Sequence, residues 1–264
     1  MGFGLIIIGD EILSGRRQDS HMPRVIEMLK QRGLSLSWAE YIADDRERIV
    51  ATLKRSFASG DVVFSTGGIG ATPDDHTRQC AALALQREIV LHPEAKILIQ
   101  ERIVETAKEG ELLDLNSPDN LQRLRMGEFP EGAALIPNPF NKIPGFAIQN
   151  HYFVPGFPVM AHPMLEWVLD THYAHLFNQD HFVEKALWVF EAMEASLTPM
   201  MEALETKYAG LKVFSLPSVK TATVRSHIEL GVKGEPQQVD LAFAEMRAYL
   251  EERGLELVLD QRPS

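Results

Sequence analysis

Residues 61–77 read DVVFSTGGIGATPDDHT, and this stretch decides the fold. The apolar, β-rich residues Asp61 to Thr66 predict a short buried strand that stops at the glycines following it. Gly67, Gly68 and Gly70 permit positive φ and let the backbone come close to whatever lies above the strand. The rest of the chain can be placed around this strand and its glycine turn.

A helix-start signal follows the glycines without a spacer. Thr72 is the expected N-cap, with Pro73 at the first helical position and Asp75 at the third, where a carboxylate can complete a capping box. Free N–H groups and the helix dipole would then form an anion site above the strand. Asp74 and Asp75 would repel a phosphate there unless a divalent metal ion such as Mg²⁺ lay between them. The alternative is that both carboxylates only cap the helix and complement its dipole.

The composition is that of a globular protein with an acidic surface. The chain has 264 residues, 45% of them hydrophobic, and a net charge of −11. Nucleic acid and anionic membranes are negatively charged and would be repelled by this net charge, so neither is expected as a partner. Met1–Ile8 is too short and too poor in basic residues for a signal peptide, and no apolar run approaches the ~20 residues of a membrane span. With Cys80 as the only cysteine, these features predict a cytoplasmic protein in a reducing compartment.

The first part of the chain alternates strands with long helices, which predicts βαβ units in a mostly parallel sheet. Strands are expected over Phe3–Gly9, Leu34–Ile42, Asp61–Thr66 and Glu88–Leu91, with a hairpin over Gly145–Gln149 and Tyr152–Val154. Helices are expected over Ser20–Gly33, Asp44–Gly60 and Thr72–Gln86, and from Pro93, Asn116 and Pro158 onward. In such sheets ligands bind beyond the carboxyl ends of the strands. The stretches Gly9–Gly15 and Gly67–Asp75 both lie at such ends, so they can converge on one site.

A polar segment from Leu176 to His181 marks the expected boundary between two domains, residues 1–176 and 177–264. Beyond it the patterns predict a β-α-β-β-α-β order, with elements over Phe182–Phe190, Ala195–Tyr208, Lys212–Leu216, Ala222–Val232, Pro236–Arg253 and Glu256–Leu259. This order is typical of a small α+β sandwich with its helices on one side of the sheet.

Several motifs follow one another along the first part of the chain. They are GDEILSG at residues 9–15, ADD at 43–45, STGGIGATPDDHT at 65–77, an NP…PGF segment at 138–146 and VPGFP at 154–158. In this order they resemble the molybdenum-cofactor biosynthesis (MoaB/Mog-like) domain family, and most closely the N-terminal region of the CinA family. The resemblance implies a three-layer α/β/α fold with a mostly parallel sheet. The tail from about Phe182 resembles the KH-type middle domain of the CinA family, which implies a homodimer.

The resemblance also implies a ligand and a chemistry. The fold would bind molybdopterin or an adenine nucleotide, and CinA-type domains imply hydrolysis of ADP-ribose with Mg²⁺, Mn²⁺ or Co²⁺. Carried over by motif, the contacts to the phosphates would come from Gly9, Gly67, Gly68, Gly70 and Thr72. Metal ligands or a water-orienting base would come from Asp10, Glu11, Asp45, Asp74 and Asp75. Asp75 is the first choice as metal ligand, and Asp74 and Asp75 are the expected catalytic residues.

Three places along the chain depart from the family pattern. Ser20-His21 stands where Thr-Asn is usual after Asp19, Asn141–Ile143 replaces the usual Gly-Thr-Ala, and Val159 replaces the usual Glu after the PGxP turn. Lys142 can supply a phosphate contact in place of the lost groups, although a solvated lysine is the alternative.

Three functions follow from these observations. The first is a metal-dependent pyrophosphatase acting on ADP-ribose or a similar dinucleotide. The second is a molybdopterin-handling protein that uses the same glycine loop for the phosphate of the pterin. The third is a non-catalytic ligand-binding or scaffold module. The second domain lacks a GXXG loop and carries Glu251-Glu252, so RNA binding is not expected there.

Overall fold

The structure, a computed structural model, describes residues 1–107, 114–179, 183–218 and 225–259. The chain forms two compact units, Met1–Phe177 and Asn178–Ser264, and each has its own hydrophobic core. Within the described ranges, no helix combines the length and the apolar character that crossing a membrane requires.

A six-stranded, mostly parallel sheet forms the centre of the first unit. Its strands lie in the order β2 (Leu36–Ile42), β1 (Phe3–Ile8), β3 (Val62–Thr66), β8 (His151–Val154), β7 (Gly145–Ile148) and β6 (Ala134–Ile136). The first four are parallel to one another, while β7 pairs antiparallel with β8 and β6 pairs antiparallel with β7. The predicted mostly parallel α/β sheet is therefore confirmed.

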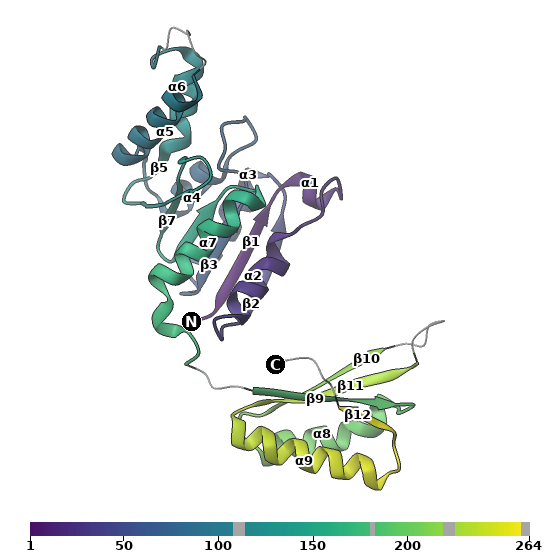
Figure 1. The fold of residues 1–264 in the computed structure, drawn as a ribbon. Coiled ribbons are helices and arrows are strands. Elements are labelled where there is room, and N and C mark those ends of the chain that lie inside the picture. The colour runs from purple at the N-terminus through teal and green to yellow at the C-terminus, as the bar shows by residue number, and fades with distance from the viewer. Residues whose placement is uncertain (108–113, 180–182, 219–224, 260–264) are drawn as a thin grey trace. The chain divides into compact units, whose positions relative to one another are not determined.

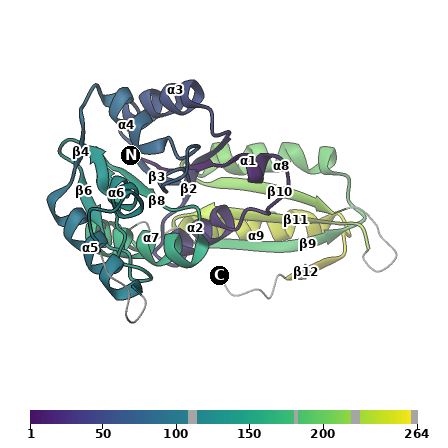
Figure 2. The ribbon, with the colours of Figure 1, turned by 90° about the horizontal axis from the view of Figure 1, so that it is seen from above.

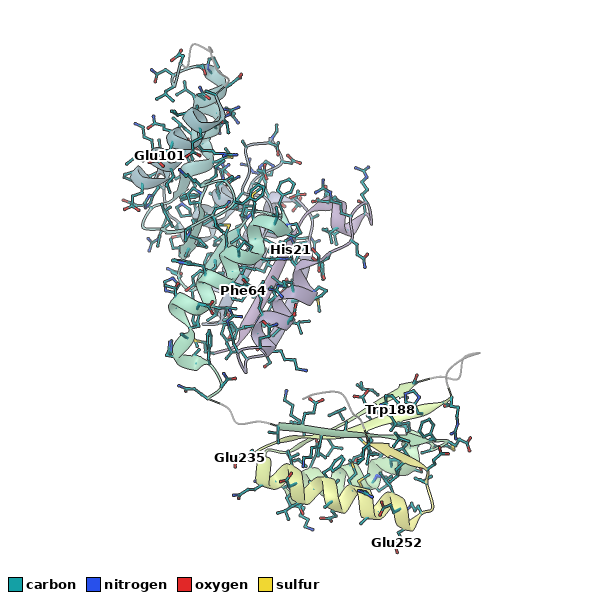
Figure 3. All side chains as sticks on the ribbon, viewed as in Figure 1. His21, Phe64, Glu101, Trp188, Glu235 and Glu252 are labelled. Atoms are coloured by element: carbon teal, nitrogen blue, oxygen red, sulfur yellow. The ribbon has the colours of Figure 1, made fainter. Side chains whose placement is uncertain are left out.

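Helices cover both faces of this sheet, as the continuous apolar run of β1 predicts. On one face α2 (His21–Lys30) and α7 (Pro158–His172) pack against alternate residues of β1 and β3 (Figure 1), around the buried side chain of Phe64 (labelled in Figure 3). On the other face lie α3 (Arg46–Phe57) and α4 (Thr77–Leu85). These layers confirm the predicted three-layer α/β/α architecture.

The remaining elements of the first unit lie around these layers. They are the short helix α1 (Asp10–Leu13), strands β4 (Ile89–Leu91) and β5 (Glu128–Pro130), helices α5 (Pro93–Thr106) and α6 (Pro118–Leu124), and the 3₁₀ turns η1 (Arg125–Gly127) and η2 (Ala174–Leu176). The strands β4 and β5 pair with each other as a separate two-stranded sheet.

The start of α4 differs from the sequence prediction, which placed the N-cap at Thr72. The helix begins at Thr77, with His76 as its N-cap. The Asp75 carboxylate does reach back, because its Oδ2 accepts from the Thr72 N–H at 2.8 Å and from the Thr72 hydroxyl at 2.6 Å. These bonds close a turn rather than a helix, and the helix starts only where the Thr77 N–H donates to the Gly68 carbonyl at 3.0 Å.

The second unit is an antiparallel four-stranded sheet with helices on one side, as its element order predicts. Along the chain it contains β9 (Val183–Phe190), α8 (Glu194–Lys207), β10 (Lys212–Ser218), β11 (His227–Gly234), α9 (Pro236–Glu252) and β12 (Leu257–Leu259). The strands lie side by side in the order β10-β11-β9-β12 (Figure 2). The predicted strand starts at Phe182 and Ala222 lie outside the described residues.

Candidate functional site

The carboxyl ends of the parallel strands bring four loops to one edge of the sheet. These loops follow β1, β2, β3 and β8, and they begin at residues 9, 43, 67 and 155. The chain passes from β1 to β2 on one side and returns to β3 on the other side of β1. Loops that leave neighbouring strands in opposite directions form a crevice, and open α/β sheets bind ligands at such a switch point. The expected convergence of Gly9–Gly15 and Gly67–Asp75 on this edge follows from the strand order.

The glycine turn is held tightly against the ends of β1 and β8. Gly67 and Gly68 have φ of 97° and 67°. The Gly67 N–H donates to the Val154 carbonyl at 3.1 Å, so it is already engaged. Among the described residues, the N–H groups of Gly68 and Gly70 have no hydrogen-bond acceptor. These two amides are therefore among the backbone donors that the turn can offer to an anion.

Two hydroxyl groups at the end of β3 lack partners. Ser65 and Thr66 are each 1% exposed, and neither Ser65 Oγ nor Thr66 Oγ1 forms a hydrogen bond within the described part of the chain. Buried polar atoms are normally satisfied, so an unpaired pair directly below the turn points to a bound ligand or water. Sequence reasoning missed both residues, although two hydroxyl residues ending the apolar run VVFST are the signal that marks them.

Asp10 and Asp44 join the loops after β1 and β2. The Asp10 N–H donates to Asp44 Oδ2 at 2.9 Å, and the Asp44 N–H donates to Asp10 Oδ1 at 3.2 Å. Burial raises the pKa of Asp44 above the usual range of an aspartate. The charges of Asp10, Glu11 and Asp74 raise this pKa further, which means that all four carboxyl groups share one region.

Asp45, which the sequence analysis expects as a metal ligand, lies at the start of α3. Its carboxylate accepts from the Arg48 N–H at 2.8 Å and so caps α3. The neighbouring Asp44, which the sequence analysis did not select, faces the Asp10 loop instead. In the ADD motif, Asp45 thus caps a helix, whereas Asp44 lies with Asp10 among the carboxyl groups of the site.

Asp74 and Asp75 lie in the turn before α4, and Asp75 holds this turn closed through Thr72. The nearby Thr72 hydroxyl and the Asp74 backbone N–H hold the pKa of Asp74 below its usual range. The buried Arg78, which sequence reasoning also missed, donates to the Gly70 carbonyl at 2.6 Å and to the Arg125 carbonyl. These contacts fix the turn from both sides.

Lys142 is not brought together with the glycine turn. Its ammonium group pairs with Glu105 and lies 3.5 Å from Glu101 (labelled in Figure 3), both on α5. The hydrogen bond to Glu105 raises the pKa of Lys142. Its positive charge is therefore neutralised on the surface of α5.

The structure gives a reason for the departure at His21. This side chain is buried, and its Nε2 donates to the Gly156 carbonyl at 3.1 Å. The Asp19 carboxylate accepts from the His21 N–H at 2.8 Å and from the Met22 N–H at 3.1 Å, and so satisfies the first two N–H groups of α2. His21 therefore ties the start of α2 to the loop after β8.

The acidic region, formed by the carboxyl groups of Asp10, Glu11, Asp44 and Asp74, offers the oxygen ligands that a hard cation prefers. Among the described residues, no group of three or more His, Cys, Asp or Glu side chains is arranged to hold a metal ion. Mg²⁺, however, is usually held by one or two carboxylates together with substrate phosphates and water. The paired carboxylates of Asp10 and Asp44, at the same edge of the sheet as the glycine turn, fit that requirement.

We expect Asp44→Asn to raise the melting temperature of the metal-free protein by about 2 to 4 °C, equivalent to about 1 kcal/mol. The amide oxygen can still accept from the Asp10 N–H, while a partly buried charge beside three other carboxyl groups is removed. Calorimetry in EDTA measures the shift. Asp45→Ala is the matched control and should lower stability by about 1 kcal/mol, because it removes a helix cap. A lower melting temperature for Asp44→Asn would contradict the repulsion between Asp44 and the neighbouring carboxyl groups.

The first unit matches a known protein family. Residues 4–175 match the family described as "Probable molybdopterin binding domain". The chain is 32% identical over 206 residues to a CinA-like protein of Citrifermentans bemidjiense, which covers 76% of this chain and 47% of the relative. It is 32% identical over 170 residues to a CinA-like protein of Anaeromyxobacter dehalogenans, covering 62% of this chain and 40% of that protein. The chain thus spans less than half the length of these two relatives.

The fold has a counterpart among solved structures. The crystal structure of "the protein CinA with unknown function" from Thermoplasma acidophilum matches with a TM-score of 0.55 and 24% identity, over 64% of this chain and 98% of the other. At this identity the likeness concerns the fold alone. The family match over most of the first unit, the motifs and the layered sheet agree with one another. The chain belongs to the molybdenum-cofactor biosynthesis domain family, and within it is close to the CinA-like proteins.

Proposed function

We propose that the first unit is a divalent-metal-dependent nucleotide pyrophosphatase that splits ADP-ribose, or a similar dinucleotide, with water into two monophosphates. One observation carries the proposal: four carboxyl groups gather beside a turn that offers backbone N–H groups to an anion. Carboxylates repel a phosphate, so this combination favours a ligand that arrives with a cation.

Within this proposal each part of the site has a role. Asp10 and Asp44 are the residues that would hold the metal ion. A bound divalent ion supplies charge neutralisation of phosphate oxygens and lowers the pKa of a bound water. The N–H groups of Gly68 and Gly70 stabilise the negative charge that develops on the phosphate. The Asp74 carboxylate, whose pKa is held below its usual range, would orient the attacking water.

Asp75 takes a supporting role in this scheme. Both bonds from Thr72 end on its Oδ2, and these bonds shape the turn from which Gly70 and Asp74 project. Removing Asp75 would therefore disturb the site through the shape of the turn, whether or not its carboxylate also meets the metal.

The test is release of AMP from ADP-ribose, FAD or NAD with Mg²⁺, Mn²⁺ or Co²⁺, followed by chromatography. We expect metal-dependent AMP, and we expect Asp10→Asn and Asp44→Asn each to lower kcat/KM by about 100-fold. Asp45→Asn is the matched control, because Asn also caps helices, and it should keep the wild-type rate. AMP release that survives both substitutions would overturn the assignment of these two residues.

A second function is favoured by the family match. In a molybdopterin-handling protein the same turn would receive the phosphate of the pterin. If none of the nine substrate and metal pairs above yields AMP while a pterin phosphate binds, this function replaces the first. If neither reaction nor binding is found, a non-catalytic module is the better account.

A further inference from the structure

The loop after β8 carries an exposed aromatic ring beside the glycine turn. Phe157 is 53% exposed. A Cβ on the preceding Gly156 would lie 3.5 Å from the Gly67 Cα, so the two loops are in contact. Phe157 thus follows directly after the residue that touches the proposed phosphate site.

This ring stands on a fixed backbone. Phe157 is the N-cap of α7, Pro158 is the first residue of that helix, and the Phe157 carbonyl accepts the N–H of Ala161 at 2.9 Å. The buried His21 (labelled in Figure 3) donates to the Gly156 carbonyl. A backbone held in this way loses little further entropy when a ligand packs on the ring that it carries.

An arginine from another loop lies over the same ring. The Arg17 Cζ is 5.9 Å from the centroid of Phe157. The Arg17 N–H donates to the Glu11 carbonyl at 3.0 Å, which anchors it to the acidic loop after β1. A distance near 6 Å is the outer limit of a cation–π contact, so a ligand ring can displace it at small cost.

A single exposed Phe needs no explanation by itself. Here, however, the ring is joined by a guanidinium plane, and both lie on loops of the edge that carries the anion site. We infer that Phe157 and Arg17 form a subsite for the planar heteroaromatic ring, purine or pterin, of a ligand whose phosphates bind at the glycine turn. The inference rests on the proposed function for the position of the phosphates. Aromatic and guanidinium planes stack on any flat base, so the subsite accepts the ring class and does not select one member.

The test compares two probes that differ only in the nucleoside. α,β-Methylene-ADP has a purine and a P–C–P bridge that water cannot split, and methylenediphosphonate has the same bridge without a ring. Their dissociation constants are measured by calorimetry with Mg²⁺. We expect Phe157→Leu to weaken binding of the nucleotide about 10-fold and leave the diphosphonate unchanged. Phe157→Trp should retain the affinity of the wild type.

Three results would overturn the subsite: an equal loss for both probes, no loss for the nucleotide, or no binding of any ring-bearing probe to the wild type. Because Phe157 is largely exposed, the Leu variant should melt at the wild-type temperature, which circular dichroism checks. Neopterin triphosphate forms a second arm. A stronger effect of Phe157→Leu on this probe than on the nucleotide would assign the subsite to a pterin.

The subsite and the pyrophosphatase activity can fail separately. A Phe157-dependent affinity for the nucleotide without any AMP release would keep the subsite and remove the proposed activity. AMP release that requires Asp44 but is unchanged in kcat/KM by Phe157→Leu would keep the activity and remove the subsite.

Discussion

Replacing Gly67 with alanine is expected to lower the free energy of unfolding of the first unit by about 3 to 5 kcal/mol. An added Cβ would lie 2.1 Å from the Ile8 carbonyl oxygen, and Gly67 has a φ of 97°. The obstacle is the backbone of the central strand β1, which is paired on both sides and cannot move away. Because domains are stable by only about 5 to 15 kcal/mol, the variant should be close to unfolding.

Gly60→Ala is the matched control for this prediction. Gly60 also has a positive φ, 75°, but an added Cβ meets nothing within 4 Å. Its cost is the left-handed strain alone, about 1 to 2 kcal/mol. Urea unfolding followed by tryptophan fluorescence in a Trp188→Phe background isolates the first unit, because the other two tryptophans, Trp38 and Trp167, lie in it. Equal losses in both variants would show that the contact with β1 is not what fixes Gly67.

Much of the fold could be predicted because its elements follow from local patterns. The run FGLIII is buried along its whole length, as expected of a strand covered on both faces. Helices that begin at Pro93, Pro118 and Pro158 have proline at the first helical position, where its missing N–H costs nothing. Such signals need only neighbouring residues.

The loops of the candidate site could be listed from the sequence, but the contacts that their residues make could not. Asp44 and Asp45 are adjacent and chemically identical, and only the path of the backbone decides that Asp45 caps α3 while Asp44 meets Asp10. A capping box and a closed turn use the same Thr72–Asp75 bonds, so the pattern did not reveal that the helix starts later. No observation tests the homodimer, which stays a prediction.

Contacts between residues far apart in sequence were beyond local patterns. His21 and Gly156 are separated by 135 positions, and Arg78 reaches Arg125 over 47. Both contacts join loops whose positions depend on the strand order. Sequence motifs therefore indicated which loops form the site, while the hydrogen bonds that shape these loops required the structure.

The second large effect is expected from His151: lowering the pH should lower the free energy of unfolding of the first unit. Burial lowers the pKa of His151 from 6.5 to about 4. Nδ1 donates to the Gln149 carbonyl at 2.9 Å, and Nε2 lies 2.8 Å from the Ser56 hydroxyl, which can turn from the Leu53 carbonyl (3.1 Å) to donate to a neutral ring. Below pH 6.5 the unfolded chain binds a proton that the folded chain does not, and stability falls as the pH falls. Over the window from 6.5 to about 4 the loss is about 3 kcal/mol.

Two variants separate this effect from the titration of carboxylates. His151→Gln can still bond to Ser56 but cannot titrate, so in the same Trp188→Phe background its unfolding free energy should fall by about 3 kcal/mol less than that of the wild type between pH 6.5 and pH 4. Ser56→Ala keeps the buried ring, which also packs against Phe57 with centroids 4.0 Å apart. That variant should be less stable at every pH and yet retain the wild-type slope. Parallel curves for the wild type and His151→Gln would mean that His151 takes up its proton as easily in the folded chain as in the unfolded one. The acid sensitivity would then have to come from the carboxyl groups instead.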